Sequence, residues 1–196
     1  MEFIDVFNGD ADGTCALIQL RRHSPQSSIL ITGVKRDINL LKHVKAGSSS
    51  TITVLDISFE KNASDVERLL QAGAMIHYID HHQVGESISH INLKVDIDLS
   101  ANICTSLIVD KQLQGQYRAW ALTAAFGDNL TEQAILLGIE SGFDKQQLLM
   151  LKELGTYINY NGYGASVDDL FFNPADLYQK LVSFDSPFDF LEQDRD

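Results

Sequence analysis

The sequence predicts an α/β fold, in which a parallel sheet of about five strands is flanked by helices and followed by a helical segment. Two observations predict it. In the first 80 residues, short runs rich in β-branched residues alternate with stretches of helical periodicity, as in βαβ units. After residue 100 the periodicity is helical throughout. The chain has 196 residues, 44% of them hydrophobic, which is enough for one large domain with its own core.

The first half contains four strand patterns, at residues 3–7, 29–33, 51–57 and 74–79. The helices expected between them cover residues 14–22, 38–44 and 62–72. The last of these ends before Gly73, a typical helix stop. Residues 9–13, between the first strand and the first helix, predict a turn.

The second half predicts four helices, at residues 103–113, 117–126, 131–137 and 145–157. Glycines separate several of these segments, which favours short connections. The tail, residues 185–196, is strongly acidic, so we expect it to be poorly ordered or to begin a connection.

The chain is acidic, with 27 Asp and Glu against 15 Lys and Arg and a formal net charge of −12. Such a surface repels long nucleic acid unless cations intervene, so we expect no long nucleic acid as a partner. Two cysteines are too few for a disulfide framework. Without an apolar run of membrane-spanning length or a signal-peptide pattern, we expect a cytoplasmic protein with no membrane partner. The oligomeric state is not predicted.

Acidic residues and histidines follow three of the predicted strands. They are Asp10 and Asp12 after the first strand, Asp56 after the third, and Asp80, His81 and His82 after the fourth. The carboxyl ends of parallel strands meet at one edge of a sheet, where ligands bind. Asp128, after a glycine at a predicted helix end, is placed to close the same cluster.

These residue types suit divalent metal ions. Mg²⁺ and Mn²⁺ prefer carboxylate oxygens, and Mn²⁺ also accepts imidazole. Two such ions a few ångströms apart activate water and stabilise the leaving oxygen of a phosphoester. The cluster therefore favours phosphoester chemistry.

Each motif also has an ordinary structural explanation. Residues 10–13 form a common turn sequence. Asp56 and Asp128 could each cap a helix N-terminus. Residues 80–82 could form a structural polar corner.

Other polar residues near the predicted edge allow two interpretations as well. Lys35 and Arg36 follow the second strand and could meet a phosphate or remain solvated. Thr105 and Ser106, near a predicted helix start, could cap that helix or bind a phosphate.

Four motifs in order resemble those of the DHH phosphoesterase family, which includes RecJ-like exonucleases, nanoRNases, cyclic-dinucleotide phosphodiesterases and manganese-dependent pyrophosphatases. The motifs are Asp10-Ala11-Asp12-Gly13, Asp56 within Val54-Leu55-Asp56-Ile57, Asp80-His81-His82, and Gly127-Asp128-Asn129. The resemblance covers residues 1–160, which would form the Rossmann-like catalytic domain of that family. It also accounts for the fifth strand, since the periodicity alone predicts four.

The resemblance implies roles for these residues. Two Mn²⁺ ions, with Mg²⁺ as the alternative, would be held by Asp10, Asp12, Asp56, His81 and Asp128, with Asp56 bridging. His82 would contact the phosphate or transfer a proton, and Asp80 would orient the ligating imidazole or join the ligands. A hydroxide activated by both metal ions would be the nucleophile.

The sequence departs from the family pattern at two places. Asn8 stands where many members have histidine, so the expectation is that one metal ion is held more weakly or that activity is low; we also assign Asn8, with Lys35 and Arg36, a weak role in substrate binding. Residues 161–196 are too short for the family's substrate-binding domain, so we interpret them as an extension or the start of a linker to such a domain.

The sequence therefore predicts a metal-dependent phosphoesterase or phosphoanhydride hydrolase. Its substrate would be a small phosphorylated molecule: a short oligonucleotide, a nucleotide or a polyphosphate. The alternative is a degenerate, non-catalytic DHH domain that binds a phosphorylated ligand or a partner protein.

Overall fold

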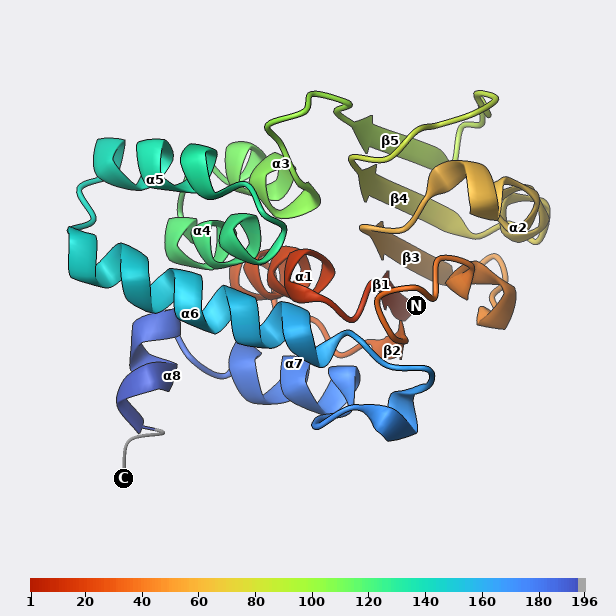
Figure 1. The fold of residues 1–196 in the computed structure, drawn as a ribbon. Coiled ribbons are helices and arrows are strands. Elements are labelled where there is room, and N and C mark those ends of the chain that lie inside the picture. Colours follow the sequence, from red (N-terminus) through yellow and green to blue (C-terminus); the bar gives the residue numbers. More distant parts are fainter. Residues whose placement is uncertain (194–196) are drawn as a thin grey trace.

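The computed structural model describes residues 1–193 and confirms the predicted α/β class. Five strands form one parallel sheet in the order β2-β1-β3-β4-β5 (Figure 1). The strands are β1 (Glu2–Phe7), β2 (Ile29–Thr32), β3 (Ser50–Leu55), β4 (Met75–Asp80) and β5 (Leu93–Ile97). The chain reverses its direction across the sheet between β1 and β3, and in open α/β sheets such a switch point is where ligands bind.

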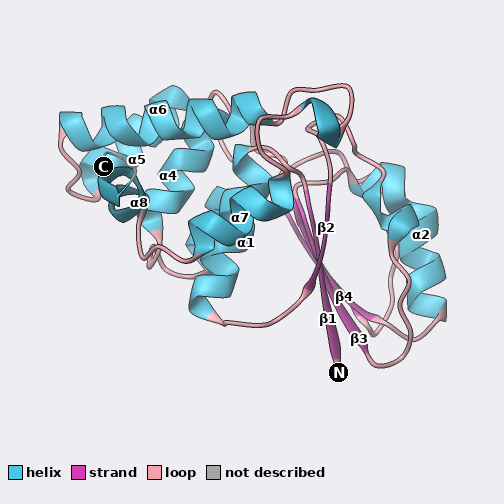
Figure 2. Cartoon of the chain, turned by 90° about the horizontal axis from the view of Figure 1, so that it is seen from below, coloured by secondary structure: helices cyan, strands magenta, loops and turns pink. Residues whose placement is uncertain are grey.

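The two faces of the sheet are covered unequally. Figure 2 shows α2 on one side and α1, α4, α6 and α7 on the other. The first face carries α2 (Phe59–Gln71) and the 3₁₀ turn η1 (Leu40–His43). The helices beyond the second face are α1 (Ala11–His23), α3 (Thr105–Gln112), α4 (Arg118–Gly127), α5 (Thr131–Glu140), α6 (Lys145–Asn161), α7 (Pro174–Val182) and α8 (Pro187–Gln193). A second 3₁₀ turn, η2 (Val167–Asp169), precedes α7.

A hydrophobic core lies on each face of the sheet. The side chains of the central strands alternate between the two faces and so contribute to both cores. In β1, Ile4 and Val6 pack on the α2 side, whereas Phe7 belongs to the helical side. In β3, Val54 and Leu55 divide in the same way. Strands buried on both faces read as apolar runs, which is why the sequence located them well.

The structure shifts several predicted boundaries. α1 begins at Ala11, so residues 11–13 are helix and not part of a turn. α2 begins at Phe59, three residues before the predicted start, because Ser58 caps it by accepting a hydrogen bond from the Lys61 nitrogen. The helix predicted at 38–44 is only the single turn η1. β5 is a half-exposed edge strand, so it lacks the apolar run that identified the others.

The C-terminal segment packs on the rest of the protein. In α7, Tyr178 meets Phe7 of β1 with ring centroids 5.6 Å apart, and Leu181 is fully buried. The prediction of poor order is wrong for α8, where Phe190 packs edge-on against Phe184 with centroids 5.4 Å apart. Residues 194–196 of that prediction lie outside the described part of the chain.

No helix within residues 1–193 has the length and apolar character needed to cross a lipid bilayer.

Candidate metal centre

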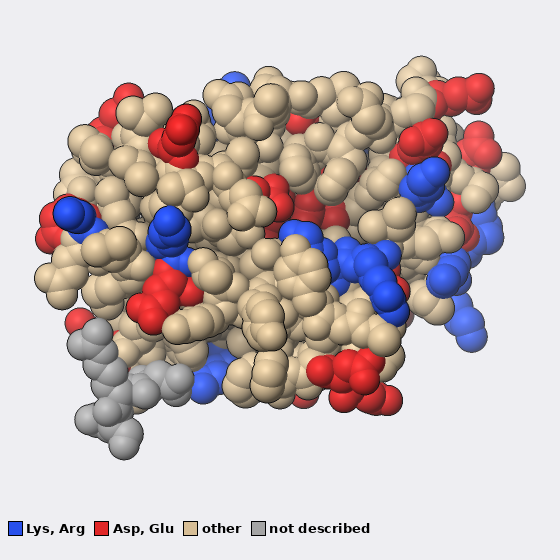
Figure 3. Space-filling view, in the orientation of Figure 1, with Lys and Arg blue, Asp and Glu red and all other residues tan. Residues whose placement is uncertain are grey.

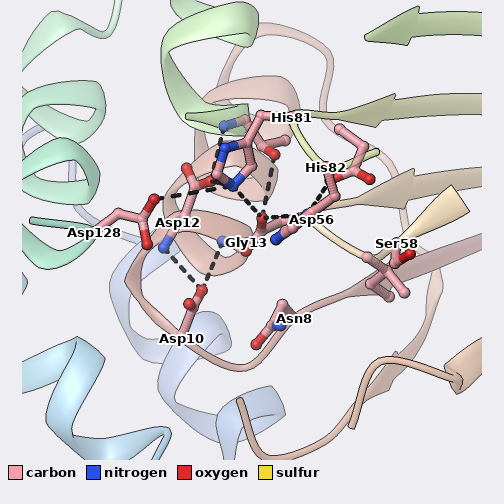
Figure 4. Close-up of polar contacts among 12 residues, drawn as sticks. Asn8, Asp10, Asp12, Gly13, Asp56, Ser58, His81, His82 and Asp128 are labelled. Atoms are coloured by element: carbon pink, nitrogen blue, oxygen red, sulfur yellow. Dashed lines mark hydrogen bonds and ion pairs between the residues drawn. The ribbon is translucent and has the colours of Figure 1, made fainter. Parts of the chain in front are cut away.

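The ends of β1, β3 and β4 bring the predicted acidic residues and histidines together. Figure 4 shows Asp10, Asp12, Asp56, His81 and Asp128 pointing toward one another. In the space-filling view, acidic side chains gather at the centre of one face, directly beside a band of Lys and Arg (Figure 3).

Asp10 starts helix α1 and also forms an ion pair. Its Oδ1 accepts hydrogen bonds from the backbone nitrogens of Asp12 and Gly13, at 3.0 and 3.1 Å. Its Oδ2 lies 2.6 Å from Nζ of Lys35. Both oxygens of this buried carboxylate therefore have partners within the protein.

Asp12 joins helix α1 to the N-terminus of α3. Its Oδ2 and Oδ1 accept hydrogen bonds from the backbone nitrogens of Thr105 and Ser106, at 2.8 and 2.7 Å. The hydroxyl of Ser106 donates in return to the Asp12 carbonyl oxygen at 2.9 Å. A carboxylate placed there satisfies helix N–H groups that otherwise lack partners. Thr105 and Ser106 are therefore the first two residues of α3 and do not cap it themselves; the Asp12 carboxylate, 93 residues away from Thr105, caps their N–H groups.

Asp56 sits at the centre of the cluster in an unusual backbone conformation. Its φ is +58°, in the left-handed region that Asp and Asn tolerate better than most residues. Its Oδ1 accepts a hydrogen bond from the Thr105 hydroxyl at 3.3 Å. Burial, reinforced by the charges of Asp12 and Asp10, raises the pKa of Asp56 well above its usual value. Asp56 is not a helix cap, since Ser58 caps α2.

His81 lies among three of these carboxylates. Its Nε2 is 3.4 Å from Oδ1 of Asp56, 3.8 Å from Oδ2 of Asp12 and 3.9 Å from Oδ2 of Asp128. One imidazole nitrogen and three carboxylate oxygens therefore lie around one space. They come from four separate segments of the chain.

Asp128 enters this space from the C-terminal end of α4. It does not cap the next helix, because the N-cap of α5 is Leu130, which has no polar side chain. Burial, reinforced by the charges of Asp12 and Asp10, raises the pKa of Asp128 to about 6.

Asp80 and His82 form a separate pair beside this cluster. Oδ1 of Asp80 lies 2.7 Å from Nδ1 of His82, and this hydrogen bond raises the pKa of His82. The imidazole that Asp80 contacts is therefore that of His82, and not that of the candidate ligand His81. Asp80 is fully buried, and its Oδ2 has no hydrogen-bond partner. His82 is about half exposed and can meet a ligand from outside.

A cavity of about 390 Å³ opens over the cluster. Its lining includes the predicted residues Asn8, Asp10, Lys35, Asp56, His81, His82 and Asp128, and four residues not predicted, Ile38, Ser58, Lys61 and Gln83. A larger and mainly apolar groove between α6, α7 and α8 contains none of the predicted site residues.

The two basic residues after β2 diverge. Nζ of Lys35 reaches into the cluster, where Asn159 Oδ1 also accepts its hydrogen bond at 2.9 Å. The Arg36 guanidinium instead donates to the carbonyl oxygen of Ala165 at 2.7 Å, and Arg36 does not line the cavity.

Two residues that the prediction missed, Lys61 and Gln83, line the cavity, and Asn159 contributes a contact from residues 159–164, a turn-rich stretch that could line the crevice but whose pattern favoured a loop. Asn159 is an ordinary helix residue, and its contact with Lys35 depends on how α6 packs. Lys61 and Gln83 carry no motif of their own. Their positions just after the ends of β3 and β4, close to Asp56 and His82, are the only signals that could have found them.

The donor set fits a divalent metal ion. Within residues 1–193, two groups offer at least three ligand atoms that lie within 4.8 Å of one another: Asp12, His81 and Asp128, and Asp56, His81 and His82. The second observation is Asn8, whose buried Oδ1 has no hydrogen-bond partner although Asn8 lines the cavity. This free acceptor can take a hydrogen bond from a water molecule bound to such an ion.

Comparison with solved structures places the fold. A crystal structure of exonuclease RecJ bound to manganese matches over 93% of this chain, with a TM-score of 0.52 and 15% sequence identity. The fold is RecJ-like. This agrees with the resemblance of the four motifs to the DHH family. The chain spans 59% of the length of that RecJ chain.

A second structure, RecJ in complex with Mn²⁺ from Thermus thermophilus, matches over 93% of this chain and 34% of its own. Its TM-score is 0.47 and its identity is 14%. No family model matches the sequence. Comparison with curated proteins finds no match either.

Proposed function

We propose that this protein is a metal-dependent phosphoesterase that hydrolyses a small phosphorylated substrate. The observation that carries the proposal is the approach of three carboxylates, those of Asp12, Asp56 and Asp128, to Nε2 of His81 at the switch point of the sheet. The RecJ-like fold supports it, since the similar structure is an exonuclease bound to manganese.

Asp12, Asp56, His81 and Asp128 are the candidate ligands of the ion, for which Mn²⁺ is the first choice because it accepts both carboxylate and imidazole. When bound, such an ion lowers the pKa of water and neutralises phosphate charge. The protein's own contribution is to hold the ligands rigidly. Hydrogen bonds from Thr105 fix Asp12 and Asp56 before any ligand arrives.

His82 is the candidate group for contact with the phosphate or for proton transfer. It is half exposed at the cavity wall, and Asp80 holds its Nδ1, which leaves Nε2 for a ligand. The hydrogen bond that His82 donates to Asp80 favours the protonated imidazole, which can donate to a phosphate oxygen. Asp80 is therefore a positioning residue for His82.

The cavity and the surface charge favour a small substrate. Lys35 and Lys61 are the cations that line the cavity within the described residues, and the Ser58 hydroxyl beside them can donate to a phosphate oxygen. A net charge of −12 disfavours a long polyanion. We therefore propose a short oligonucleotide, a nucleotide or a short polyphosphate as the substrate.

A direct test is hydrolysis of bis-p-nitrophenyl phosphate, a short oligoribonucleotide and pyrophosphate, each with Mn²⁺ and with chelator. Asp56→Asn is the suitable inactive variant, because Asn tolerates the positive φ that Ala would find strained. We expect turnover that requires Mn²⁺ and that Asp56→Asn lowers at least 100-fold. Hydrolysis that survives both the chelator and the variant would disprove the proposal. Metal binding without turnover of any substrate would favour the non-catalytic alternative.

A further inference from the structure

Asp10 differs from the other carboxylates of the centre. Neither of the two groups of candidate ligands within residues 1–193 includes it. Its Oδ1 caps α1, and its Oδ2 lies 2.6 Å from Nζ of Lys35. An ion bound to Asp10 would first have to displace an ammonium group.

Hydrogen bonds hold both the backbone and the side-chain end of Lys35 beside Asp10. Its backbone nitrogen donates to the carbonyl oxygen of Gly162 at 2.8 Å, and its carbonyl oxygen accepts from Nδ2 of Asn8 at 3.1 Å. At the other end, Nζ donates to Oδ1 of Asn159 at 2.9 Å. Lys35 is therefore held by two segments, the end of α6 and the residue after β1, and its position does not depend on Asp10 alone.

The same ammonium group bridges two carboxylates. Nζ is 3.6 Å from Oδ1 of Asp128, whose other oxygen faces His81. Lys35 thus lies against the candidate metal ligands and supplies one positive charge where the carboxylates crowd.

The residue beside this ammonium group is also a poor metal ligand. A neutral amide, as in Asn8, binds a divalent ion more weakly than a carboxylate or an imidazole does. Its Nδ2 is occupied by the carbonyl of Lys35, which leaves only Oδ1. Asn8 and Asp10 therefore offer little to a second divalent ion compared with the ligands grouped around His81.

We propose that the centre takes a single divalent ion among the ligands grouped around His81, and that the Lys35 ammonium replaces a second ion beside Asp10. This inference rests on the proposed metal-dependent function. It revises the two-ion arrangement implied by the family resemblance, in which Asp10 is a ligand. Lys35 would then provide the second positive charge next to a bound phosphate without requiring a second metal ion.

The test is the number of Mn²⁺ ions bound per folded chain without substrate, measured by calorimetric titration and by the loss of the free-Mn²⁺ electron paramagnetic resonance signal. We expect one ion for the unaltered protein. Lys35→Met, which keeps the length of the side chain without its charge, is expected to bind two. Lys61→Met removes a charge from the same cavity without touching Asp10, and should still bind one.

Asp10→Asn provides the complementary measurement, because Asn retains an oxygen that can cap α1. We expect one bound ion, with a dissociation constant within about threefold of the unaltered protein. Two ions in the unaltered protein, the loss of an ion in Asp10→Asn, or a single ion in Lys35→Met would each overturn the inference while leaving the proposed function intact. No bound ion in the unaltered protein would overturn both. Circular dichroism of each variant would establish that it is folded.

Discussion

Oδ1 of Asp12 lies 2.7 Å from the backbone nitrogen of Ser106, the second residue of α3. One carboxylate therefore has two roles. It accepts hydrogen bonds from the N-terminal N–H groups of α3, and it faces the candidate metal ligand His81. The packing of α3 on α1 and the geometry of the site depend on the same side chain.

Asp12→Ala should destabilise the protein more than Asp12→Asn. Both variants remove the charge, but only Asn retains an oxygen that can accept from the N–H groups of Thr105 or Ser106, which are fully buried. A buried donor left without a partner costs about 1–3 kcal/mol. Urea unfolding in chelator should therefore give a lower free energy of unfolding for Ala than for Asn, by at least about 1 kcal/mol. Equal values would show that Asp12 does not support α3.

Asp56→Asn should make the protein more stable in chelator at pH 7. The Asp56 carboxylate is buried among Asp12, Asp10, Asp80 and Asp128, and its raised pKa reports the cost of keeping it charged. A neutral amide avoids that cost, for a gain on the order of 1 kcal/mol.

With saturating Mn²⁺, the unaltered protein should become more stable than Asp56→Asn, the reverse of the order in chelator. A ligand that binds only the folded state stabilises it by about 2.7 kcal/mol at 100 times its dissociation constant. The unaltered protein should gain this in thermal unfolding, and Asp56→Asn should gain little. An equal Mn²⁺-dependent shift in both proteins would remove Asp56 from the ligands.

Asp80→Asn should impair the role of His82 without unfolding the site. The Asp80 hydrogen bond is the largest cause of the raised pKa of His82, so the pKa should fall toward its usual value in the variant. Nuclear magnetic resonance titration of the histidine ring without metal measures this directly. Loss of a positioning carboxylate typically lowers activity about 10–100-fold. An unchanged His82 titration would show that Asp80 does not control it.

His77 offers a pH dependence outside the metal centre. It lies in β4, with its Nε2 2.6 Å from Oδ2 of Asp96 in β5. Burial lowers the pKa of His77 below that of an unfolded histidine, about 6.5. In the pH range just below 6.5 the unfolded chain therefore binds more protons at this position than the folded one, and stability falls as the pH falls.

The matched variant His77→Gln isolates this effect, because every other titrating group is common to both proteins. The free energy of unfolding should drop more between about pH 7.5 and about pH 5.5 in the unaltered protein than in His77→Gln. Urea unfolding at the two pH values measures the difference. A larger drop in His77→Gln than in the unaltered protein would mean that the ion pair with Asp96 affects the pKa of His77 more than burial does.

Much of the fold could be predicted because local patterns and buried positions coincide. The strands β1, β3 and β4 are apolar runs buried on both faces, and their carboxyl ends carry Asp10, Asp56 and Asp80 in or just beyond the strand. The parallel arrangement then places these residues at one edge without further information. β5 and α8 were harder to predict, since an exposed edge strand and a short acidic helix have weak periodicity.

The partners of the charged side chains were decided by the tertiary structure. Nothing in the sequence pairs Asp12 with Ser106, or Lys35 with Asp10 and Asn159, because these contacts join segments far apart in the chain. Lys35 and Arg36 look equivalent in sequence, yet only Lys35 enters the centre.

The sequence by itself therefore determined the α/β class and which residue types reach the edge of the sheet, because periodicity and strand direction are local properties. Only the tertiary structure decided which carboxylates face His81 and which one holds an ammonium group. Those distances depend on how α3, α4 and α6 pack against the sheet and α1, and packing is a property of the whole chain.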